Sequence, residues 1–196
     1  METSAYLDSL RQDIVFNDTL CGLPFTFHTT WGLFSPREID DGSRLLLQHI
    51  ELPIDADCLD IGCGYGTLGL TLARLAPQGR TLLVDKDFVA IDYCRKNIQL
   101  NGIGNAEAML SNGLGAIGER RFDIIVSNLP AKVGKELLQL LLHDAHQHLN
   151  PGGRLYVVTI TGLRRFIQRH FIETFGNYDK LKQGAHYTVA MACKTR

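Results

Sequence analysis

The sequence predicts an α/β protein with a Rossmann-like, mostly parallel sheet and helices on both of its faces. From residue 57 onward, short apolar runs alternate with helical stretches, which is the rhythm of βαβ units. The runs are apolar throughout, as expected of strands that are buried on both faces. Ligands of such sheets bind beyond the carboxyl ends of the strands, so the turns after residues 61, 84, 110 and 127 should meet at one site.

The elements can be assigned in order along the chain. Residues 4–12 fit a short helix, and 14–20 and 24–29 fit the two strands of a hairpin. Ser43 suits the N-cap of a helix over 44–51, and LNPGG at 149–153 predicts a break in regular structure. Further strands are predicted at 58–61, 81–84, 105–110, 122–127, 154–160 and 187–193, and helices at 67–76, 88–101, 134–148 and 163–175.

The composition is that of a cytoplasmic protein with one well-buried core. The chain has 196 residues, 45% of them hydrophobic, and no apolar run approaches the roughly 18 residues of a membrane span. The amino-terminal residues Met1 to Ser4 show no signal pattern. The five cysteines contain no Cys-x-x-Cys pair, so we expect reduced thiols. His143, His146 and His148 fit metal-ligand spacing poorly, and no metal is expected.

Charge is distributed unevenly along the chain. The net charge is −1, but residues 154–196 hold eight basic residues against two acidic ones. Arg164, Arg165 and Arg169 lie on one predicted helix, and Arg165 and Arg169 share a face. These arginines are candidates for contacts with RNA phosphates. The alternative is an ordinary solvated helix face.

The turn after the first of the predicted parallel strands combines an aspartate with glycines, in the pattern Asp60-x-Gly62-x-Gly64-x-Gly66-x-x-Gly69. Its last three glycines also fit a dinucleotide fingerprint. A carboxylate would repel the pyrophosphate of a dinucleotide, but it suits a ligand that carries an ammonium and a sulfonium group. Electrostatics therefore favour S-adenosylmethionine over a nicotinamide dinucleotide. Glycines that serve the backbone alone are the third alternative.

Two further turns supply candidate cofactor-binding residues. Asp85 ends the second of these strands, where a carboxylate can accept both hydroxyl groups of an adenosine ribose. A helix N-cap is the alternative, although Asp87 is better placed for it. Asn112 can contact the adenine amino group or can simply form a turn. The neighbouring Lys86 and Gly113 complete this set.

Four motifs occur in an order and spacing that identify a family: LDIGCGYGTLGLTLA, VDKDFVAIDYCRKNIQLNG, FDIIVSNLPAKVGKE and LNPGGRLYVV. Over about residues 25–195 the chain resembles the class I S-adenosylmethionine-dependent methyltransferases. More narrowly, it resembles the methyltransferase small domain group, which includes bacterial small-subunit ribosomal RNA guanine-N2 methyltransferases. The lead-in GLFS…DDGSRLL also fits this group. The resemblance implies a seven-stranded sheet whose last strand is antiparallel.

The same resemblance implies a division of the chain and a set of roles. Residues 1–30 would form a helix and hairpin appendage, and residues 31–196 the methyltransferase domain. Donor binding would fall to Asp60, Gly62, Gly64, Gly66, Asp85 and the region of Asn112. Trp31 and Phe34 precede the domain's lead-in; we expect them mainly to pack the hairpin on the core, the alternative being a cap over the cofactor pocket.

The fourth of these strands ends in Asn128-Leu129-Pro130, where the family has Asn-Pro-Pro and then an aromatic or aliphatic residue. Leu129 replaces the first proline, and Ala131 replaces a residue that in some members stacks on a base. Asn112 stands where many members have aspartate. Pro130 still biases Leu129 towards an extended conformation. The departures leave the alternative that this turn is degenerate and the domain only binds cofactor.

The expected reaction is methylation of a planar exocyclic amine, a poor nucleophile whose lone pair is conjugated. The side-chain oxygen of Asn128 and the carbonyl of Leu129 are candidate acceptors that would hold the amine and stabilise its developing charge. Guanine N2 of ribosomal RNA is the leading target by resemblance. A protein glutamine or a small-molecule amine presents similar chemistry, and a nicotinamide-binding oxidoreductase is the alternative from another class.

Overall fold

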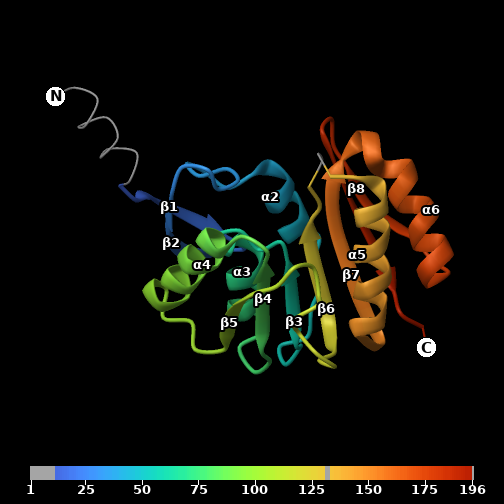
Figure 1. Ribbon diagram of the computed structural model, residues 1–196, viewed down its shortest axis with the longest axis horizontal. Coiled ribbons are helices and arrows are strands. Elements are labelled where there is room, and N and C mark those ends of the chain that lie inside the picture. Colours follow the sequence, from blue (N-terminus) through green and yellow to red (C-terminus); the bar gives the residue numbers. More distant parts are fainter. Residues whose placement is uncertain (1–11, 131–132, 196) are drawn as a thin grey trace.

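The computed structural model describes residues 12–130 and 133–195, so the helix expected at 4–12 falls essentially outside it. In this part of the chain, seven strands form one sheet in the order β5-β4-β3-β6-β7-β9-β8 (Figure 1). Strands β3 to β7 pair in parallel, and β9 is antiparallel to both of its neighbours. The predicted Rossmann-like fold is confirmed. Its strands are β3 (Cys58–Ile61), β4 (Thr81–Asp85), β5 (Ala106–Leu110), β6 (Phe122–Asn128), β7 (Leu149–Ile160), β8 (Asp179–Gln183) and β9 (Tyr187–Cys193).

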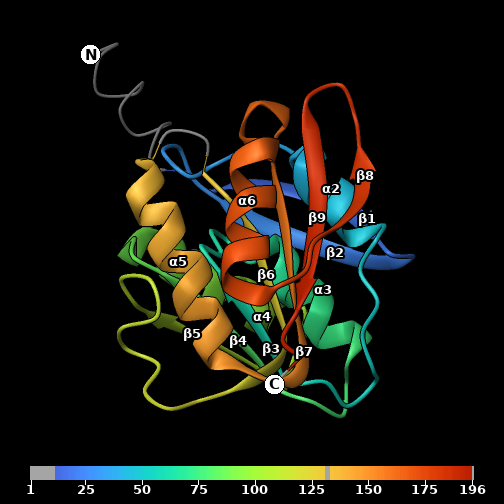
Figure 2. The same cartoon turned by 90° about the vertical axis from the view of Figure 1, so that its right-hand side faces the viewer.

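Helices cover both faces of the sheet. One face carries α2 (Asp41–Leu47), α3 (Thr67–Leu75) and α4 (Phe88–Leu100). The other carries α5 (Lys135–His148) and α6 (Arg164–Phe175), which stand in front of the sheet in Figure 2. Strand residues alternate between the two cores: Cys58 joins the first and Leu59 the second. This two-sided burial explains why the central strands are apolar at nearly every position.

Strand β8 has no counterpart among the elements predicted from the sequence. It has the sequence Asp-Lys-Leu-Lys-Gln, and four of its five residues are exposed. It lies at the edge of the sheet, next to β9. Lysines are common on edge strands because they oppose pairing with another chain. Such a strand has no apolar signature, and periodicity therefore does not reveal it.

The predicted hairpin is confirmed, formed by β1 (Ile14–Leu20) and β2 (Leu23–Thr29). Phe25 and Phe27 on β2 are buried in the same core as α3 and α4. The ring of Phe27 meets Tyr65 edge-on, with the centroids 5.6 Å apart. The hairpin thus shares a core with the main sheet, and the domain boundary at residue 30 stays a prediction.

Two boundaries differ from those predicted. Helix α2 begins at Asp41, and its N-cap is Asp40 rather than Ser43, because the Asp40 carboxylate accepts the N–H of Ser43. The break predicted at 149–153 is wrong, because these residues are the first part of β7. Gly152 N donates to Lys194 O at 2.7 Å, which continues the antiparallel pairing where Pro-Gly-Gly would ordinarily end it.

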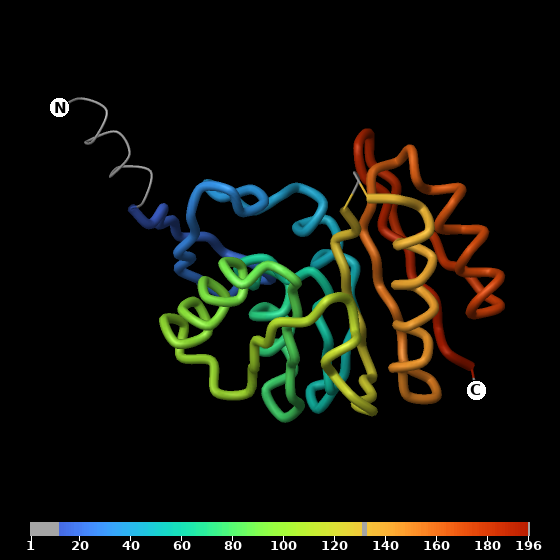
Figure 3. Tube along the Cα trace, in the orientation of Figure 1, coloured from blue at the N-terminus to red at the C-terminus, as the bar shows by residue number. Residues whose placement is uncertain are grey.

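The chain reaches α2 by crossing the carboxyl edge of the sheet, as Figure 3 shows for the segment after β2. Tyr65, in the glycine turn, fixes this crossing by donating its hydroxyl to the carbonyls of Ser35 and Glu38 at 3.1 and 3.3 Å. Helix α2 therefore lies against the end of the sheet where the predicted site should form. Among the described helices, none is long and apolar enough to cross a membrane.

Candidate functional site

The turns after β3, β4, β5 and β6 lie at one edge of the sheet, because these parallel strands are neighbours in the order β5-β4-β3-β6. Gly62, Lys86, Asn112 and Gly113 are exposed there, and Asp85 is half-buried. The structure therefore brings the predicted cofactor-binding residues to one edge of the sheet, where Asp60 and Gly66 are buried. What each of them binds stays a prediction.

The glycine turn needs glycine for two different reasons. Gly62, Gly64 and Gly66 all have positive φ, at 72°, 55° and 104°, a region that side chains with Cβ avoid. A Cβ on Gly62 or Gly64 would meet no atom within 4 Å, so the backbone there is open to a ligand. A Cβ on Gly69 would lie 2.3 Å from Leu83, so this last glycine lets α3 pack closely on the sheet.

Asp60 lies beneath the glycine turn and is 1% exposed. Its Oδ2 accepts the N–H of Gly69 at 2.8 Å, and its Oδ1 is buried without a partner among the described residues. Burial raises the pKa of Asp60 to about 7; the Gly69 N–H opposes the rise, and the charge of Asp85 adds to it. A positive charge near the turn would favour the ionised form of this buried carboxyl group, whose Oδ1 has no partner among the described residues.

Asp85 is held in place by two backbone groups. Its Oδ2 accepts the N–H of Gly64 at 2.9 Å, and its Oδ1 accepts the N–H of Asp87 at 3.0 Å. Asp87 itself caps α4, as expected, by accepting the N–H of Val89. Each oxygen of Asp85 keeps a lone pair, because a carboxylate has about four acceptor positions. The carboxylate is therefore rigid and can still accept hydroxyl groups.

The turn after β5 is organised by Ser111 rather than by Asn112. The Ser111 hydroxyl donates to Gly113 O at 2.8 Å and accepts the N–H of Ala116 at 3.2 Å. Asn112 contributes its backbone carbonyl, to Gly115 N, and its side chain is exposed. The Asn112 side chain therefore forms no turn hydrogen bond within the described residues, and its contact with adenine stays a prediction.

Asn128 ends β6 with its amide nitrogen already engaged. Nδ2 donates to Asp40 Oδ2 at 2.8 Å and to Ser43 Oγ at 3.0 Å. Asp40 Oδ1 accepts the hydroxyl of Tyr187, on β9, at 2.9 Å. Within 12–130 and 133–195, no residue donates to Asn128 Oδ1. We call Asp40, Ser43, Tyr187 and Asn128 the α2–β6–β9 cluster; the sequence indicates Ser43 only as a helix cap and does not reveal the others as partners of Asn128.

Leu129 and Pro130 continue the strand beyond Asn128. Leu129 N donates to Val158 O at 2.9 Å, which adds one more rung to the β6–β7 ladder. The Leu129 side chain is 3% exposed and belongs to the core under α5 and α6. Pro130 is exposed, and Ala131 lies outside the described residues. Replacing the family's proline with leucine thus adds a backbone hydrogen bond and a core contact.

Three arginines are the candidates for contacts with RNA phosphates. Arg164 and Arg165 occupy the first turn of α6, which starts near the end of β7, and Arg164 Nη1 donates to Gln183 Oε1 at 2.5 Å. Arg169 lies farther along the helix, and its Nε is 3.7 Å from a carboxylate oxygen of Glu173. Cations oppose the dipole at the start of a helix, so Arg164 and Arg165 do not serve helix stability.

The expected packing of Trp31 and Phe34 is wrong. Trp31 is 44% exposed under the guanidinium of Arg37, and Phe34 is 65% exposed. Between them, Leu33 is the residue that enters the core. The apolar residues of this loop look alike in the sequence, which does not indicate that Leu33 is the buried one.

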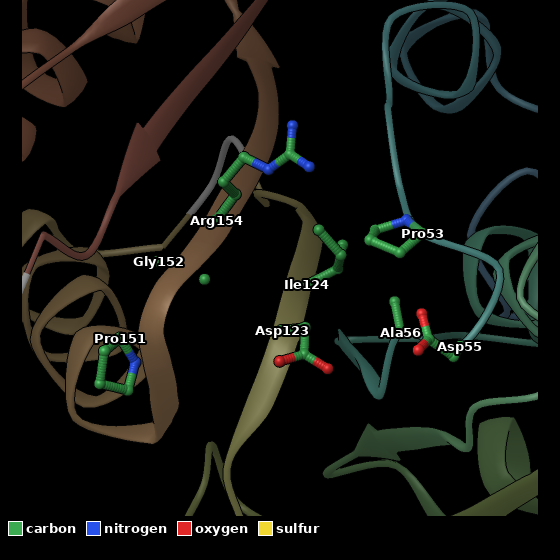
Figure 4. Close-up of a pocket in the computed structure, with 9 residues that line it drawn as sticks. Pro53, Asp55, Ala56, Asp123, Ile124, Pro151, Gly152 and Arg154 are labelled. Carbon is green, nitrogen blue, oxygen red and sulfur yellow. The ribbon is translucent and has the colours of Figure 1, made fainter.

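The opposite edge of the sheet carries a hollow of about 340 Å³ (Figure 4). It lies between the segment before β3 and the amino ends of β6 and β7, and it includes Asp55, Asp123 and Arg154. Both oxygens of Asp123 already accept hydrogen bonds, from Asn150 and from the backbone of Asp57. This hollow is far from the turns described above. Across the described residues, no group of three or more His, Cys, Asp or Glu side chains could hold a metal ion.

A glycine turn, a rigid aspartate and a strand-end asparagine at one edge of a Rossmann-like sheet define a class of cofactor-dependent domain. The family described as "Methyltransferase small domain" has a sequence model that matches residues 24–191, and the chain belongs to this family. The resemblance drawn from the four sequence motifs is therefore confirmed.

Particular relatives bear the names of ribosomal RNA enzymes. The chain is 35% identical to a "Ribosomal RNA small subunit methyltransferase C" of Hamiltonella defensa, over 96% of this chain and 58% of that protein. It is 30% identical to a "Ribosomal RNA large subunit methyltransferase G" of Klebsiella pneumoniae, over 90% of this chain and 48% of that one. The chain thus spans about half the length of these curated relatives.

A solved structure is similar across the same region. It is a Thermus thermophilus 16S rRNA N2 G1207 methyltransferase in complex with AdoMet and guanosine. The TM-score is 0.84 at 32% identity, covering 93% of this chain and 50% of that one. A ribosomal protein L11 methylase from Lactobacillus delbrueckii shares the fold, with a TM-score of 0.68 at 22% identity.

Proposed function

We propose that this protein is an S-adenosylmethionine-dependent N-methyltransferase that acts on guanine N2 of ribosomal RNA. One observation carries the proposal: both hydrogens of the Asn128 amide have acceptors, so its Oδ1 is left to accept from a substrate. An exocyclic amine is a donor group that fits this oxygen. The relatives act on ribosomal RNA according to their names, and one of them was solved with guanosine.

The residues around the glycine turn fit the methyl donor. The open backbone at Gly62 and Gly64 leaves room for the amino acid part of the donor. The Asp60 Oδ1, which has no partner among the described residues, would interact with the donor's positive charge. Asp85 would accept the ribose hydroxyls, and Asn112 would accept the adenine amino group. The remaining candidates at this edge are Gly66, Lys86 and Gly113. When bound, the donor supplies a methyl carbon that is activated by the adjacent sulfonium.

At the other side of the site, Asn128 Oδ1 and the Leu129 carbonyl would each accept one hydrogen of the amine. These contacts orient the nitrogen lone pair towards the methyl carbon. They also stabilise the positive charge that grows on nitrogen as the C–N bond forms and the C–S bond breaks. The extra proton then leaves to solvent, so no strong base is required. Pro130 biases Leu129 towards an extended conformation, and we expect the Leu129 carbonyl to point at the site.

The basic start of α6 supports an RNA substrate. Arg164 and Arg165 lie at the edge of the sheet where the site opens, and both can meet phosphates. Arg169 is a weaker candidate because Glu173 offsets its charge. A ribosomal RNA substrate implies that the protein acts in the cytoplasm.

A protein glutamine or a small-molecule amine is the alternative substrate, and the experiment below distinguishes it from RNA.

The decisive experiment is transfer of labelled methyl from S-adenosylmethionine. Deproteinised ribosomal RNA, intact subunits and total protein are offered in parallel, and the methylated nucleoside is identified by mass spectrometry. We expect N2-methylguanosine in RNA. Label only in glutamine or only in small molecules would move the proposal to the other amines. Binding of the nicotinamide dinucleotide instead of S-adenosylhomocysteine, measured by calorimetry, would overturn it.

Asn128→Ala supplies the matched variant. We expect methyl transfer to be lost while S-adenosylhomocysteine binds within a few-fold of the wild type. The reason is that the Asn128 side chain contacts Asp40 and Ser43 and not the glycine turn. Equal loss of donor binding and of transfer would remove Asn128 from the proposed role.

A further inference from the structure

We propose that Asp40, Ser43 and Tyr187 are positioning residues that determine which end of the Asn128 amide faces the substrate. The inference rests on the proposed function, because it concerns how the acceptor for the amine is presented. These residues come from α2 and from the start of β9, and they meet Asn128 at the end of β6. None of them needs to contact the substrate.

The chemistry of the cluster fixes the amide in one direction. An asparagine amide has a donor end and an acceptor end of nearly equal size, and rotation by 180° exchanges them. The Asp40 carboxylate can only accept, so the end of Asn128 that it contacts must be Nδ2. Ser43 Oγ takes the second hydrogen of Nδ2. The substrate side is left with Oδ1, a pure acceptor.

The carboxylate that sets this direction is itself held from two other sides. Its Oδ2 also accepts the backbone N–H of Ser43, and its Oδ1 accepts the hydroxyl of Tyr187. Burial and the contact with Asp40 raise the pKa of Tyr187, so this hydroxyl keeps its proton and stays a donor. Together with Asn128 Nδ2, these two groups give the Asp40 carboxylate three donors. They fix the orientation of its side chain at the N-cap position of α2.

Gly42 allows these groups to come together. A Cβ on Gly42 would lie 2.8 Å from Asp40 Oδ2 and 3.0 Å from two ring atoms of Tyr187. A side chain here would push the ring or the carboxylate out of position, although Gly42 is helical and needs no unusual backbone angle. The sequence Asp40-Asp41-Gly42-Ser43 therefore places a cap, a gap and a hydroxyl within four positions beside Asn128.

A flipped amide would present Nδ2 to the amine of the substrate, and two donors would then face each other. Small errors in the placement of reacting groups cost about 10²-fold in rate. The cluster accordingly acts on the rate of transfer and not on the affinity for the donor, which binds at the glycine turn. If the Asn128 amide is no longer held in one orientation, kcat should fall and the KM for the donor should stay nearly unchanged.

The test is Asp40→Asn, in the whole chain with RNA and S-adenosylmethionine. Asparagine caps helices as well as aspartate, and it has nearly the same shape. As an amide, however, it can donate to Asn128 Oδ1 and so permits the flipped state. We expect kcat to fall by roughly 10- to 100-fold, with the KM for S-adenosylmethionine and the melting temperature nearly unchanged. Asp41→Asn is the matched control, because it removes the same charge from an exposed neighbour and should keep wild-type kcat.

A measurement that does not depend on catalysis separates this inference from the proposed function. With ¹⁵N-labelled asparagine, the Asn128 side-chain NH₂ resonances are assigned by their loss in Asn128→Ala. They should shift in Asp40→Asn and not in Asp41→Asn. Tyr187→Phe, which keeps the ring and the helix cap, should give a smaller shift and a smaller fall in kcat. Unchanged resonances and unchanged kcat in Asp40→Asn would overturn the inference, even where the wild type methylates RNA. A wild type without methyltransferase activity but with the expected shifts would overturn the proposed function alone.

Discussion

The backbone N–H of Leu129 donates to the carbonyl oxygen of Val158, with 2.9 Å between nitrogen and oxygen. This bond extends the parallel pairing of β6 and β7 by one residue past Asn128. A proline at position 129 has no N–H and could not make it. The departure from the family's Asn-Pro-Pro pattern therefore exchanges a fixed backbone angle for a hydrogen bond.

We expect Leu129→Pro to lower the free energy of unfolding by at least about 1 kcal/mol, the usual contribution of one hydrogen bond. Losing part of the buried leucine side chain adds to that figure. Urea unfolding measures the change. Methyl transfer by the folded fraction should stay within a few-fold, because the introduced proline and Pro130 would both hold the chain extended. An unchanged unfolding free energy would contradict the importance of this bond.

Asp60 should make stability depend on pH. Its pKa is raised to about 7 in the folded state, whereas the unfolded chain releases that proton near pH 4. The folded state therefore binds more protons between these values, so this group lowers the free energy of unfolding as pH rises from about 4 to about 7. Asp60→Asn should flatten that part of the curve, and it should stabilise most above pH 7. Denaturant unfolding of both proteins across this range provides the comparison, and identical slopes would argue against a raised pKa.

Donor binding should be linked to the same proton. A positive charge near Asp60 favours its ionised form, so binding of S-adenosylmethionine below about pH 7 should release protons. Calorimetry in buffers of different ionisation enthalpy measures the number released. We expect a smaller number with Asp60→Asn. If wild type and variant release equal numbers of protons, the titrating group is a different one.

Asp85→Ala should weaken binding of S-adenosylhomocysteine by roughly 10- to 100-fold, since hydrogen bonds to a charged group contribute about 1.5–3 kcal/mol. The substitution also removes the acceptor of the Gly64 and Asp87 N–H groups, and this contributes to the loss of affinity. Asp87→Asn is the control, because it changes the same charge two residues away and keeps a good N-cap. Calorimetric affinity that is the same for Asp85→Ala and wild type would end the ribose assignment.

Arg165→Gln should reduce the salt dependence of RNA binding. Each phosphate contact contributes about 0.7 to 0.9 to the slope of log affinity against log salt concentration. Arg169→Gln should reduce the slope less, because Glu173 already lies 3.7 Å from this arginine. Fluorescence anisotropy with a ribosomal RNA fragment at several salt concentrations gives both slopes. A slope for Arg165→Gln equal to that of the wild type would place the RNA elsewhere.

Much of the fold could be predicted because it depends on local patterns. The parallel strands are apolar on both faces, and each is followed by a turn and a helix, so their order and their shared edge followed directly. The edge strand β8 has no such pattern, because water covers it on most sides. The start of β7 could not be predicted because Asn-Pro-Gly-Gly usually ends regular structure, and its backbone partners, Lys194 and Phe122, are distant in the sequence.

The candidate site also has features that local sequence predicts and features that it does not. The placement of glycines and aspartates at one edge of the sheet was predictable, because it follows from backbone angles and from the order of the strands; what they bind stays a prediction. The partners of Asn128 were not predictable from local sequence. Asp40 is 88 residues before it, and the hydroxyl that Asp40 accepts comes from a residue 147 positions later. Packing alone brings these segments together.

The separation of those three segments has a consequence for folding. The glycine turn and Asp85 are close in sequence and can form early, whereas contacts between distant segments form late because closing long loops is entropically unfavourable. Tyr187 begins β9, which lies between β7 and β8, so its contact with Asp40 depends on the pairing of these strands. A partly folded chain could thus hold the donor while its asparagine still turns freely. The chain would then be able to transfer the methyl group only after folding is complete.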